Sequence, residues 1–203
     1  MKNNIMEEEK DICIFGDSIT WGAYDPENGG WATMLRNYYE EKDGRSVYAL
    51  GICGDTTEGL LKRMEIEAFA REPKMIIFAI GANDAQFLKE EKRNQISLNR
   101  FKDNLKKLVV IANRFTNKTG FIGILDVDDS LVAVDSYAED HLYKSEFMRE
   151  YNNVLKEFCS INNIPFLEVF DLLDKDDFVD GLHPNSQGHK KLFKKIIGFL
   201  ESL

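Results

Sequence analysis

Five short and almost uninterrupted apolar runs constrain the fold of this chain more than any other feature. They are Ile12–Phe15, Val47–Leu50, Met75–Ile80, Gly120–Leu125 and Pro165–Phe170. Runs of this length that do not alternate with polar residues are typical of strands buried on both faces, as in a parallel sheet. We therefore predict a five-stranded, mostly parallel sheet.

Amphipathic stretches separate the apolar runs, and their apolar residues recur at spacings of three and four, as on one face of a helix. Strands that alternate with helices predict an α/β fold, a three-layer α/β/α sandwich, in a single domain over residues 1–203. Residues 1–10 are expected to be a flexible N-terminal segment. The expected helices are Trp31–Tyr39, Thr56–Ala70, Leu98–Phe115, Phe147–Ile161 and Gln187–Leu200.

The charge balance narrows the range of partners. The chain has 26 basic and 35 acidic residues, a net charge of −9, which repels nucleic-acid phosphates and anionic membrane surfaces. The N-terminus has no apolar signal segment, and no apolar run approaches the length of a membrane span. We expect a cytoplasmic protein with a small-molecule partner, no nucleic acid and no membrane insertion, while the oligomeric state stays open.

The cysteines and acidic clusters do not predict a metal site. Cys13, Cys53 and Cys159 lie far apart in the sequence and form no C-x-x-C pair. The aspartates that begin the segment Asp126–Lys144 lack the ligand spacing of a calcium loop. We expect neither a metal nor a cofactor.

Polar loops punctuated by glycine follow the first three apolar runs, and a fourth precedes the last predicted helix. They are Gly16–Ser18 (Gly-Asp-Ser), Gly51–Thr57, Gly81–Asp84 (Gly-Ala-Asn-Asp) and Asp180–His183 (Asp-Gly-Leu-His). Sites in parallel α/β sheets lie beyond the carboxyl ends of the strands, so these loops are expected to converge at one edge. Each motif alone is weak, and their combination carries the prediction.

In this order and spacing, the four loops resemble the marker blocks of the SGNH hydrolase superfamily of GDSL-like lipases and acylhydrolases. The resemblance covers the chain from about residue 11 to residue 200 and implies a flavodoxin-like SGNH hydrolase fold. It makes Ser18, Gly51, Asn83 and His183 the four name-giving residues, with Asp180 completing a catalytic triad. The stretch Leu50–Thr57 is similar to the acyl-esterase and thioesterase-like branch, whereas Asp126–Lys144 is the least family-like part.

The chemistry of these residue types agrees with the resemblance. A serine hydroxyl needs a base to become a nucleophile, and His183 is expected to be that base, with Asp180 orienting its ring. An oxyanion hole is expected from the backbone N–H groups of Ser18 and Gly51 and from the side-chain amide of Asn83. At Gly51 the end of a strand frees the N–H, and the missing Cβ lets the substrate approach.

These residues predict a serine hydrolase that cleaves carboxylic esters or thioesters of small, short-chain acyl groups through an acyl-enzyme, with thioesterase or lysophospholipase activity as possible variants. One alternative is a carbohydrate O-acetyl esterase with the same catalytic residues, and another is a non-catalytic α/β ligand-binding module. Asp126–Lys144 is expected to border the site, with too few apolar residues to sheath a long alkyl chain. His189 is expected to be exposed to solvent, and Cys53 is expected to be inert.

Overall fold

The computed structural model describes residues 11–132 and 140–203. Five parallel strands form the main sheet in the order β2-β1-β3-β6-β8. The predicted parallel sheet is therefore confirmed, although its last two strands are shorter than their apolar runs. The strands are β1 (Ile12–Gly16), β2 (Val47–Gly51), β3 (Met75–Ala79), β6 (Thr119–Ile122) and β8 (Phe166–Leu167).

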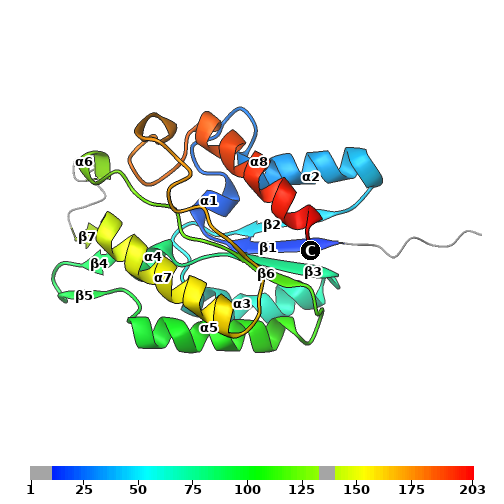
Figure 1. The fold of residues 1–203 in the computed structure, drawn as a ribbon, viewed down its shortest axis with the longest axis horizontal. Helices are drawn as coiled ribbons and strands as arrows, with labels where there is room; N and C mark the ends of the chain where they lie inside the picture. Colours follow the sequence, from blue (N-terminus) through cyan, green and yellow to red (C-terminus); the bar gives the residue numbers. More distant parts are fainter. Residues whose placement is uncertain (1–10, 133–139) are drawn as a thin grey trace, which may run out of the picture.

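Helices cover both faces of this sheet, so the three-layer sandwich is also confirmed. Helices α2 (Gly30–Asp43) and α8 (Ser186–Glu201) pack together on one face. Helices α3 (Thr57–Phe69), α5 (Leu98–Ala112) and α7 (Ser145–Ile161) form the layer on the other face, as Figure 1 shows. All five lie where the apolar spacing predicts them, with ends that differ by a few residues.

Two separate cores explain why the strands are apolar without alternation. Successive side chains of a strand point to opposite faces. In β1, Ile12 and Ile14 pack in the core beneath α2 and α8, whereas Cys13 and Phe15 pack in the core beneath α3, α5 and α7. Each face of the sheet has its own apolar layer, and every position in β1 is buried.

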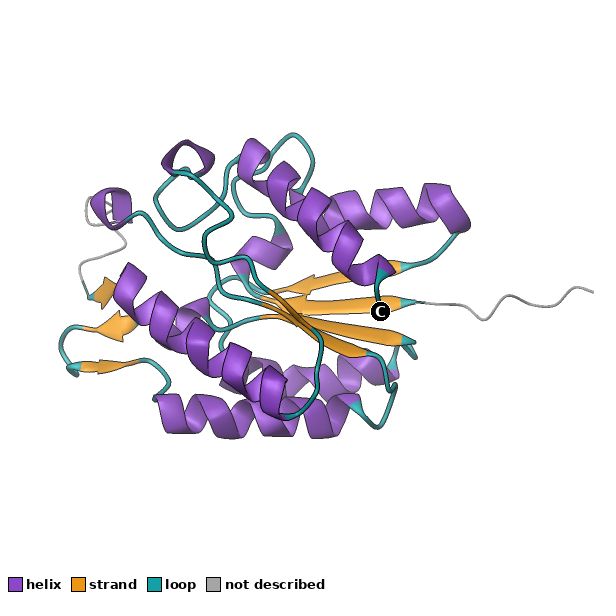
Figure 2. Ribbon diagram, in the orientation of Figure 1, coloured by secondary structure: helices purple, strands orange, loops and turns teal. Residues whose placement is uncertain are grey.

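The carboxyl end of the sheet carries short elements that the sequence patterns do not predict. A small antiparallel sheet consists of β5 (Arg93–Asn94), β4 (Phe87–Leu88) and β7 (His141–Leu142), and Figure 2 shows it at one end of the molecule. Elements of two to four residues are too short to display a periodicity. The short helices are α1 (Ser18–Trp21), α4 (Ala82–Ala85), α6 (Asp129–Val132) and the 3₁₀ turn η2 (Lys175–Asp177).

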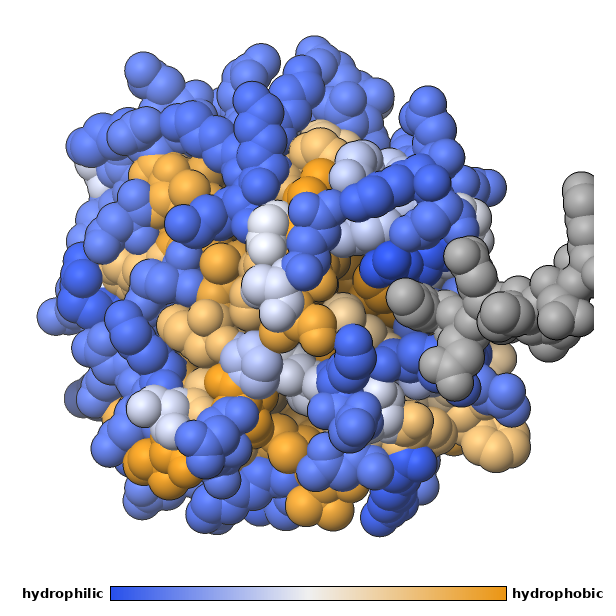
Figure 3. Space-filling model, turned by 45° about the vertical axis from the view of Figure 1, so that its right-hand side comes forward, coloured by the Kyte–Doolittle hydropathy of each residue, from blue (hydrophilic) through white to orange (hydrophobic). Residues whose placement is uncertain are grey.

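Hydrophilic side chains dominate the outline of the face in Figure 3, and apolar ones show between them. Within the described part of the chain, no helix has the length and apolar character needed to cross a membrane. Residues 1–10, which were expected to be a flexible segment, lie outside the described residues, and so do residues 133–139 of the segment Asp126–Lys144.

Candidate active site

Ser18 is the first residue of α1, directly beyond the end of β1. The Asp17 side chain caps this helix by accepting a hydrogen bond from the Ile19 N–H at 3.0 Å. Gly16 makes the tight turn possible, because a Cβ there would lie 2.1 Å from the Thr20 Oγ1. Burial raises the pKa of Asp17 to about 6, and the Ile19 N–H opposes this increase. The local sequence thus holds the Ser18 hydroxyl at the carboxyl edge of the sheet.

The three predicted triad residues lie in hydrogen-bond contact. Ser18 Oγ is 2.9 Å from His183 Nε2, and His183 Nδ1 is 2.6 Å from Asp180 Oδ2. Ser18 and His183 are 165 positions apart in the chain, so the fold itself creates this contact. A serine, an imidazole and a carboxylate in this order can activate the hydroxyl as a nucleophile.

The loop that carries Asp180 and His183 is fixed by its own backbone. Asp180 Oδ1 accepts hydrogen bonds from the N–H groups of Leu182 (2.9 Å) and His183 (2.7 Å). The Val179 N–H donates to the His183 carbonyl at 2.9 Å, which closes the loop. Burial alone would raise the pKa of Asp180, but the hydrogen bonds from His183 and the backbone lower it below its ordinary value. The carboxylate stays ionised and holds the proton on Nδ1.

Asn83 lies on α4, directly after β3, and lines the same cleft as Ser18 and His183. Its Nδ2 donates a hydrogen bond to the Asp55 carbonyl at 2.9 Å, and its Oδ1 accepts one from the Tyr143 hydroxyl at 2.8 Å. An amide nitrogen carries two hydrogens. One N–H of Asn83 therefore remains for a ligand in the cleft.

The structure does not support the role expected for Gly51. Gly51 is absent from the described lining of the cleft. A Cβ at this position would lie 2.2 Å from the Trp21 N and 2.5 Å from the Asp17 carbonyl oxygen. The space beside Gly51 is thus filled by the backbone of α1 and not by a substrate.

Gly54 occupies the place that was expected for Gly51. It lines the cleft, and a Cβ there would meet no atom within 4 Å. Its φ of +75° turns the backbone sharply, and its N–H has no acceptor among the described residues. The Gly-Asp pair at this position is visible in the sequence, but only the three-dimensional structure distinguishes Gly54 from Gly51.

A partly buried arginine, Arg63, holds the loop that carries Gly54. Arg63 Nε donates to Asp55 Oδ2 at 2.8 Å, and its Nη2 donates to the carbonyls of Leu50 (3.0 Å) and Gly16 (3.2 Å). One guanidinium therefore joins the ends of β1 and β2 to Asp55. Through the Asp55 carbonyl, this arrangement also reaches the amide of Asn83.

The buried carboxylate of Asp84 attaches α4 to the start of α3. Asp84 is 0% exposed and accepts hydrogen bonds from both the backbone N–H and the hydroxyl of Thr57, at the start of α3. Asn104 Nδ2 donates to the same hydroxyl at 2.9 Å. Burial raises the pKa of Asp84 to about 7, and the Thr57 hydrogen bonds oppose this increase.

The cleft at the carboxyl edge of the sheet has a volume of about 570 Å³. Trp21 is 61% exposed, and the Tyr24 ring lies 5.2 Å from the His183 ring. The described lining contains no lysine, arginine or glutamate, and its only carboxylate is that of Asp180. The described lining residues are Ser18, Trp21, Ala23, Tyr24, Cys53, Gly54, Asn83, Gln86, Val132, His141, Tyr143, Asp180, Leu182 and His183.

The expectation that the segment Asp126–Lys144 borders the site is met by its described residues. Val132, His141 and Tyr143 all line the cleft. The Asp128 N–H donates to the Gly181 carbonyl at 2.8 Å, which attaches this segment to the loop that carries Asp180 and His183. Its residues Val134 and Tyr137 lie outside the described residues.

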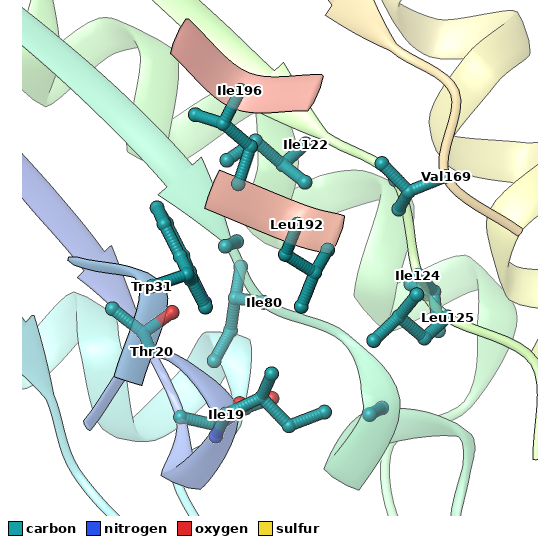
Figure 4. A pocket seen from close by; sticks show the side chains of 14 residues that line it. Ile19, Thr20, Trp31, Ile80, Ile122, Ile124, Leu125, Val169, Leu192 and Ile196 are labelled. Carbon is teal, nitrogen blue, oxygen red and sulfur yellow. The ribbon is translucent and has the colours of Figure 1, made fainter. Parts of the chain in front are cut away.

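A second, much smaller cavity lies behind α1. It has a volume of about 40 Å³ and is enclosed mainly by apolar side chains from the sheet, α2 and α8, as Figure 4 shows. Ile19 and Thr20 of α1 border it, as do Trp31 and Leu192. This volume is close to that of one or two water molecules, so the cavity cannot hold an alkyl chain.

The prediction for His189 is wrong, because this side chain is fully buried. Its Nδ1 accepts a hydrogen bond from the Trp31 N–H at 3.3 Å, and its Nε2 lies 3.1 Å from the Ala23 carbonyl oxygen. Burial lowers the pKa of His189, so the imidazole is neutral. The signal was present in the sequence, since His189 lies three positions before Leu192, on the apolar face of the helix.

Comparison with known proteins identifies the family. The model of the GDSL-like Lipase/Acylhydrolase family matches residues 14–191. The chain belongs to this family. It is thus a hydrolase that acts on ester bonds, as the sequence predicted. Among the curated proteins, none matches the chain.

Solved structures share the fold of this acylhydrolase at low identity. A lipase/acylhydrolase from Enterococcus faecalis is 24% identical, with a TM-score of 0.76 over 95% of this chain and 96% of that one. An acetylxylan esterase from Geobacillus stearothermophilus is 19% identical, with a TM-score of 0.73 over 94% of each chain. Variants of that esterase at a serine, an aspartate and a histidine are described as catalytic mutants.

Proposed function

We propose that this hydrolase works through an acyl-enzyme formed on Ser18. His183 Nε2 takes the hydroxyl proton while Ser18 Oγ attacks the ester carbonyl, and the tetrahedral intermediate then collapses as His183 returns the proton to the leaving alcohol or thiol. Water then attacks the acyl carbon while His183 takes its proton, and His183 returns this proton to Ser18 Oγ as the bond to the acyl group breaks and the acid is released. The proposal rests on the continuous contact from Ser18 through His183 to Asp180.

Three donors are proposed for the oxyanion of the intermediate. As the first residue of α1, Ser18 has an N–H with no partner inside the helix. Gly54 and Asn83 both line the cleft, and we propose that the Gly54 N–H and the second Nδ2 hydrogen of Asn83 are the other two donors. Preorganised donors of this kind stabilise the charge that develops in the transition state.

The substrates we propose are small, uncharged carboxylic esters or thioesters with short acyl groups. A cleft of about 570 Å³ is in the range that holds a small molecule. Its described lining offers no lysine or arginine to pair with an anionic substrate. The cavity behind α1 is too small to accept the end of a long chain.

A carbohydrate O-acetyl esterase remains the second candidate. The exposed Trp21 ring lines the cleft, and flat aromatic faces pack well against apolar faces of ligands. The fold shared with an acetylxylan esterase is consistent with this candidate. The non-catalytic alternative loses its support, because the chain belongs to an acylhydrolase family.

A substrate profile tests the proposal and separates the two candidates. Hydrolysis rates are measured with p-nitrophenyl acetate, an acetyl thioester and acetylated xylose, using the Ser18→Ala variant as the blank. A general short-chain esterase hydrolyses the first two substrates efficiently, and a sugar esterase has its highest kcat/KM on the third. Turnover of all three that persists in the Ser18→Ala variant would exclude the proposed nucleophile.

A further inference from the structure

We infer that Tyr143 is a positioning residue of the oxyanion hole, because its hydroxyl fixes the orientation of the Asn83 amide. This inference depends on the oxyanion role proposed for Asn83. Tyr143 lies 60 positions from Asn83, in the segment that least resembles the family. It is absent from all four motifs that identify the site in the sequence.

The amide of Asn83 is held at both ends by partners of opposite kind. The Tyr143 hydroxyl donates to Oδ1 at 2.8 Å, whereas the Asp55 carbonyl accepts from Nδ2 at 2.9 Å. A rotation of the amide by half a turn would place Oδ1 against the Asp55 carbonyl, and two acceptors cannot bond to each other. Only one orientation satisfies both partners, and in it the second N–H is left for the cleft.

The small antiparallel sheet places Tyr143 next to Asn83. Strand β7 ends at Leu142, directly before Tyr143, and pairs with β4, which follows Asn83 and α4 in the chain. On the other side, the Ser145 N–H donates to Asp129 Oδ1 at 2.8 Å. Tyr143 is thus fixed between a paired strand and the start of α7.

The environment keeps the Tyr143 hydroxyl protonated and directed. Burial raises the pKa of Tyr143 well above its ordinary value, and the negative charges of Asp17 and Asp180 add to this increase. A side-chain hydrogen bond with Gln86, a residue that is 8% exposed, opposes the increase. The hydroxyl therefore remains a hydrogen-bond donor to Asn83 throughout the neutral pH range.

The role matters for the rate because an oxyanion hole acts through donors that are already in place. If a donor must first turn into position as the negative charge forms, the free energy of that reorganisation is added to the activation free energy. Without the Tyr143 hydroxyl, Asn83 Oδ1 loses its partner, and the amide is held only through Nδ2. The chemical step should slow, while binding of the uncharged substrate should change little.

A double-mutant cycle tests this inference. The Tyr143→Phe, Asn83→Ala and double variants are compared with the wild type on p-nitrophenyl acetate. Tyr143→Phe keeps the ring in place and should lower kcat by about 10-fold, with KM within about 2-fold. In the Asn83→Ala background, the same substitution should have no further effect, because the amide that it positions is gone.

Tyr151→Phe is the matched control. The buried Tyr151 hydroxyl donates to the Ile96 carbonyl, away from the cleft, so this variant loses a comparable buried hydrogen bond. It should keep the wild-type kcat even if its thermal midpoint falls. Thermal unfolding of all variants separates loss of stability from loss of rate.

Two results would overturn the inference. One is an unchanged kcat in Tyr143→Phe, and the other is a loss of kcat on Tyr143→Phe that is equal in the wild type and in the Asn83→Ala background. If Asn83→Ala itself has the wild-type kcat, both the oxyanion role of Asn83 and the positioning role of Tyr143 are rejected. Labelling of Ser18 by a fluorophosphonate in that variant would show that the nucleophile survives this rejection.

Discussion

At the residue scale, the spacing of three between Asp180 and His183 holds the imidazole that we propose as the catalytic base. The loop is short enough that Oδ1 binds the backbone N–H of His183 while Oδ2 binds its ring. One carboxylate therefore sets both the path of the chain and the tautomer of the imidazole. The triad could be predicted from the sequence, because all of its members lie in recognisable motifs.

Replacing Asp180 with Asn should lower kcat by about 10³-fold to 10⁴-fold without unfolding the protein. The amide that faces His183 Nδ1 can be a donor, which leaves the ring proton on Nε2, where it cannot accept the Ser18 proton. Turnover of p-nitrophenyl acetate is measured beside Asp171→Asn, a control at an exposed loop position. If both variants turn over at the wild-type rate, Asp180 does not orient the base.

The buried Asp84 should make stability depend on pH. Its folded-state pKa is about 7, above the value of about 3.9 in an unfolded chain. The folded state therefore binds more protons between these values, and the contribution of Asp84 to the unfolding free energy should fall as pH rises from about 4 to about 7. Denaturant unfolding of the wild type and Asp84→Asn, compared across this range, measures it. A constant difference between the two proteins would contradict the assignment.

Other residues could not be assigned from local motifs. Tyr143 joins the site through strand pairing between segments that are distant in the sequence, and no pattern near it marks this contact. Gly51 ends β2 and Gly54 follows three residues later, and two features of the structure separate their roles: the packing of α1 against Gly51 and the open turn at Gly54. His189 could have been recognised as buried from the helical spacing alone.

At the element scale, the contact between β2 and α1 connects the main sheet to the helix that carries Ser18, the proposed nucleophile. Five strands and five long helices were predictable, because strands buried on both faces form continuous apolar runs and helices buried on one face repeat apolar residues at spacings of three and four. The short elements at the carboxyl edge were not predictable, because their structure depends on contacts with other loops. The site is built from these short elements together with the loops that connect them.

A methyl group at Gly51 should disrupt the contact between β2 and α1. The added Cβ would lie 2.2 Å from the backbone of Trp21, and no flexible side chain can move aside. Gly51→Ala should therefore lose about 1–3 kcal/mol or more of stability. Gly198→Ala is the control, because Gly198 lies in α8 and a Cβ there would meet no atom within 4 Å. Its effect on the free energy of unfolding should be neutral or slightly stabilising. Thermal midpoints that fall equally in both variants would contradict this account of Gly51.

At the scale of the whole molecule, one open cleft at the carboxyl edge must accommodate both halves of the ester. The described elements around it are short loops, helices and paired strands rather than a separate domain. The net charge of −9 and a described cleft lining without lysine or arginine both favour neutral substrates. The general position of the site followed from the parallel sheet, but the shape of the cleft required the structure.

Short acyl groups should be preferred over long ones. Each methylene buried adds about 0.8 kcal/mol of binding free energy, so kcat/KM rises with chain length only while the cleft can cover the chain. For p-nitrophenyl esters below micelle-forming concentrations, we expect kcat/KM to stop rising by about the hexanoyl ester. A steady increase to the dodecanoyl ester would show that a longer apolar channel accepts the chain.

The decisive measurement for Ser18, the proposed nucleophile of this ester hydrolase, is kcat of the Ser18→Ala variant on p-nitrophenyl acetate. We expect kcat to fall by about 10³-fold or more, because only binding and the oxyanion hole remain. Thermal unfolding should be close to that of the wild type, and fluorophosphonate labelling should disappear. Near-normal turnover by a folded Ser18→Ala protein would contradict this role of Ser18.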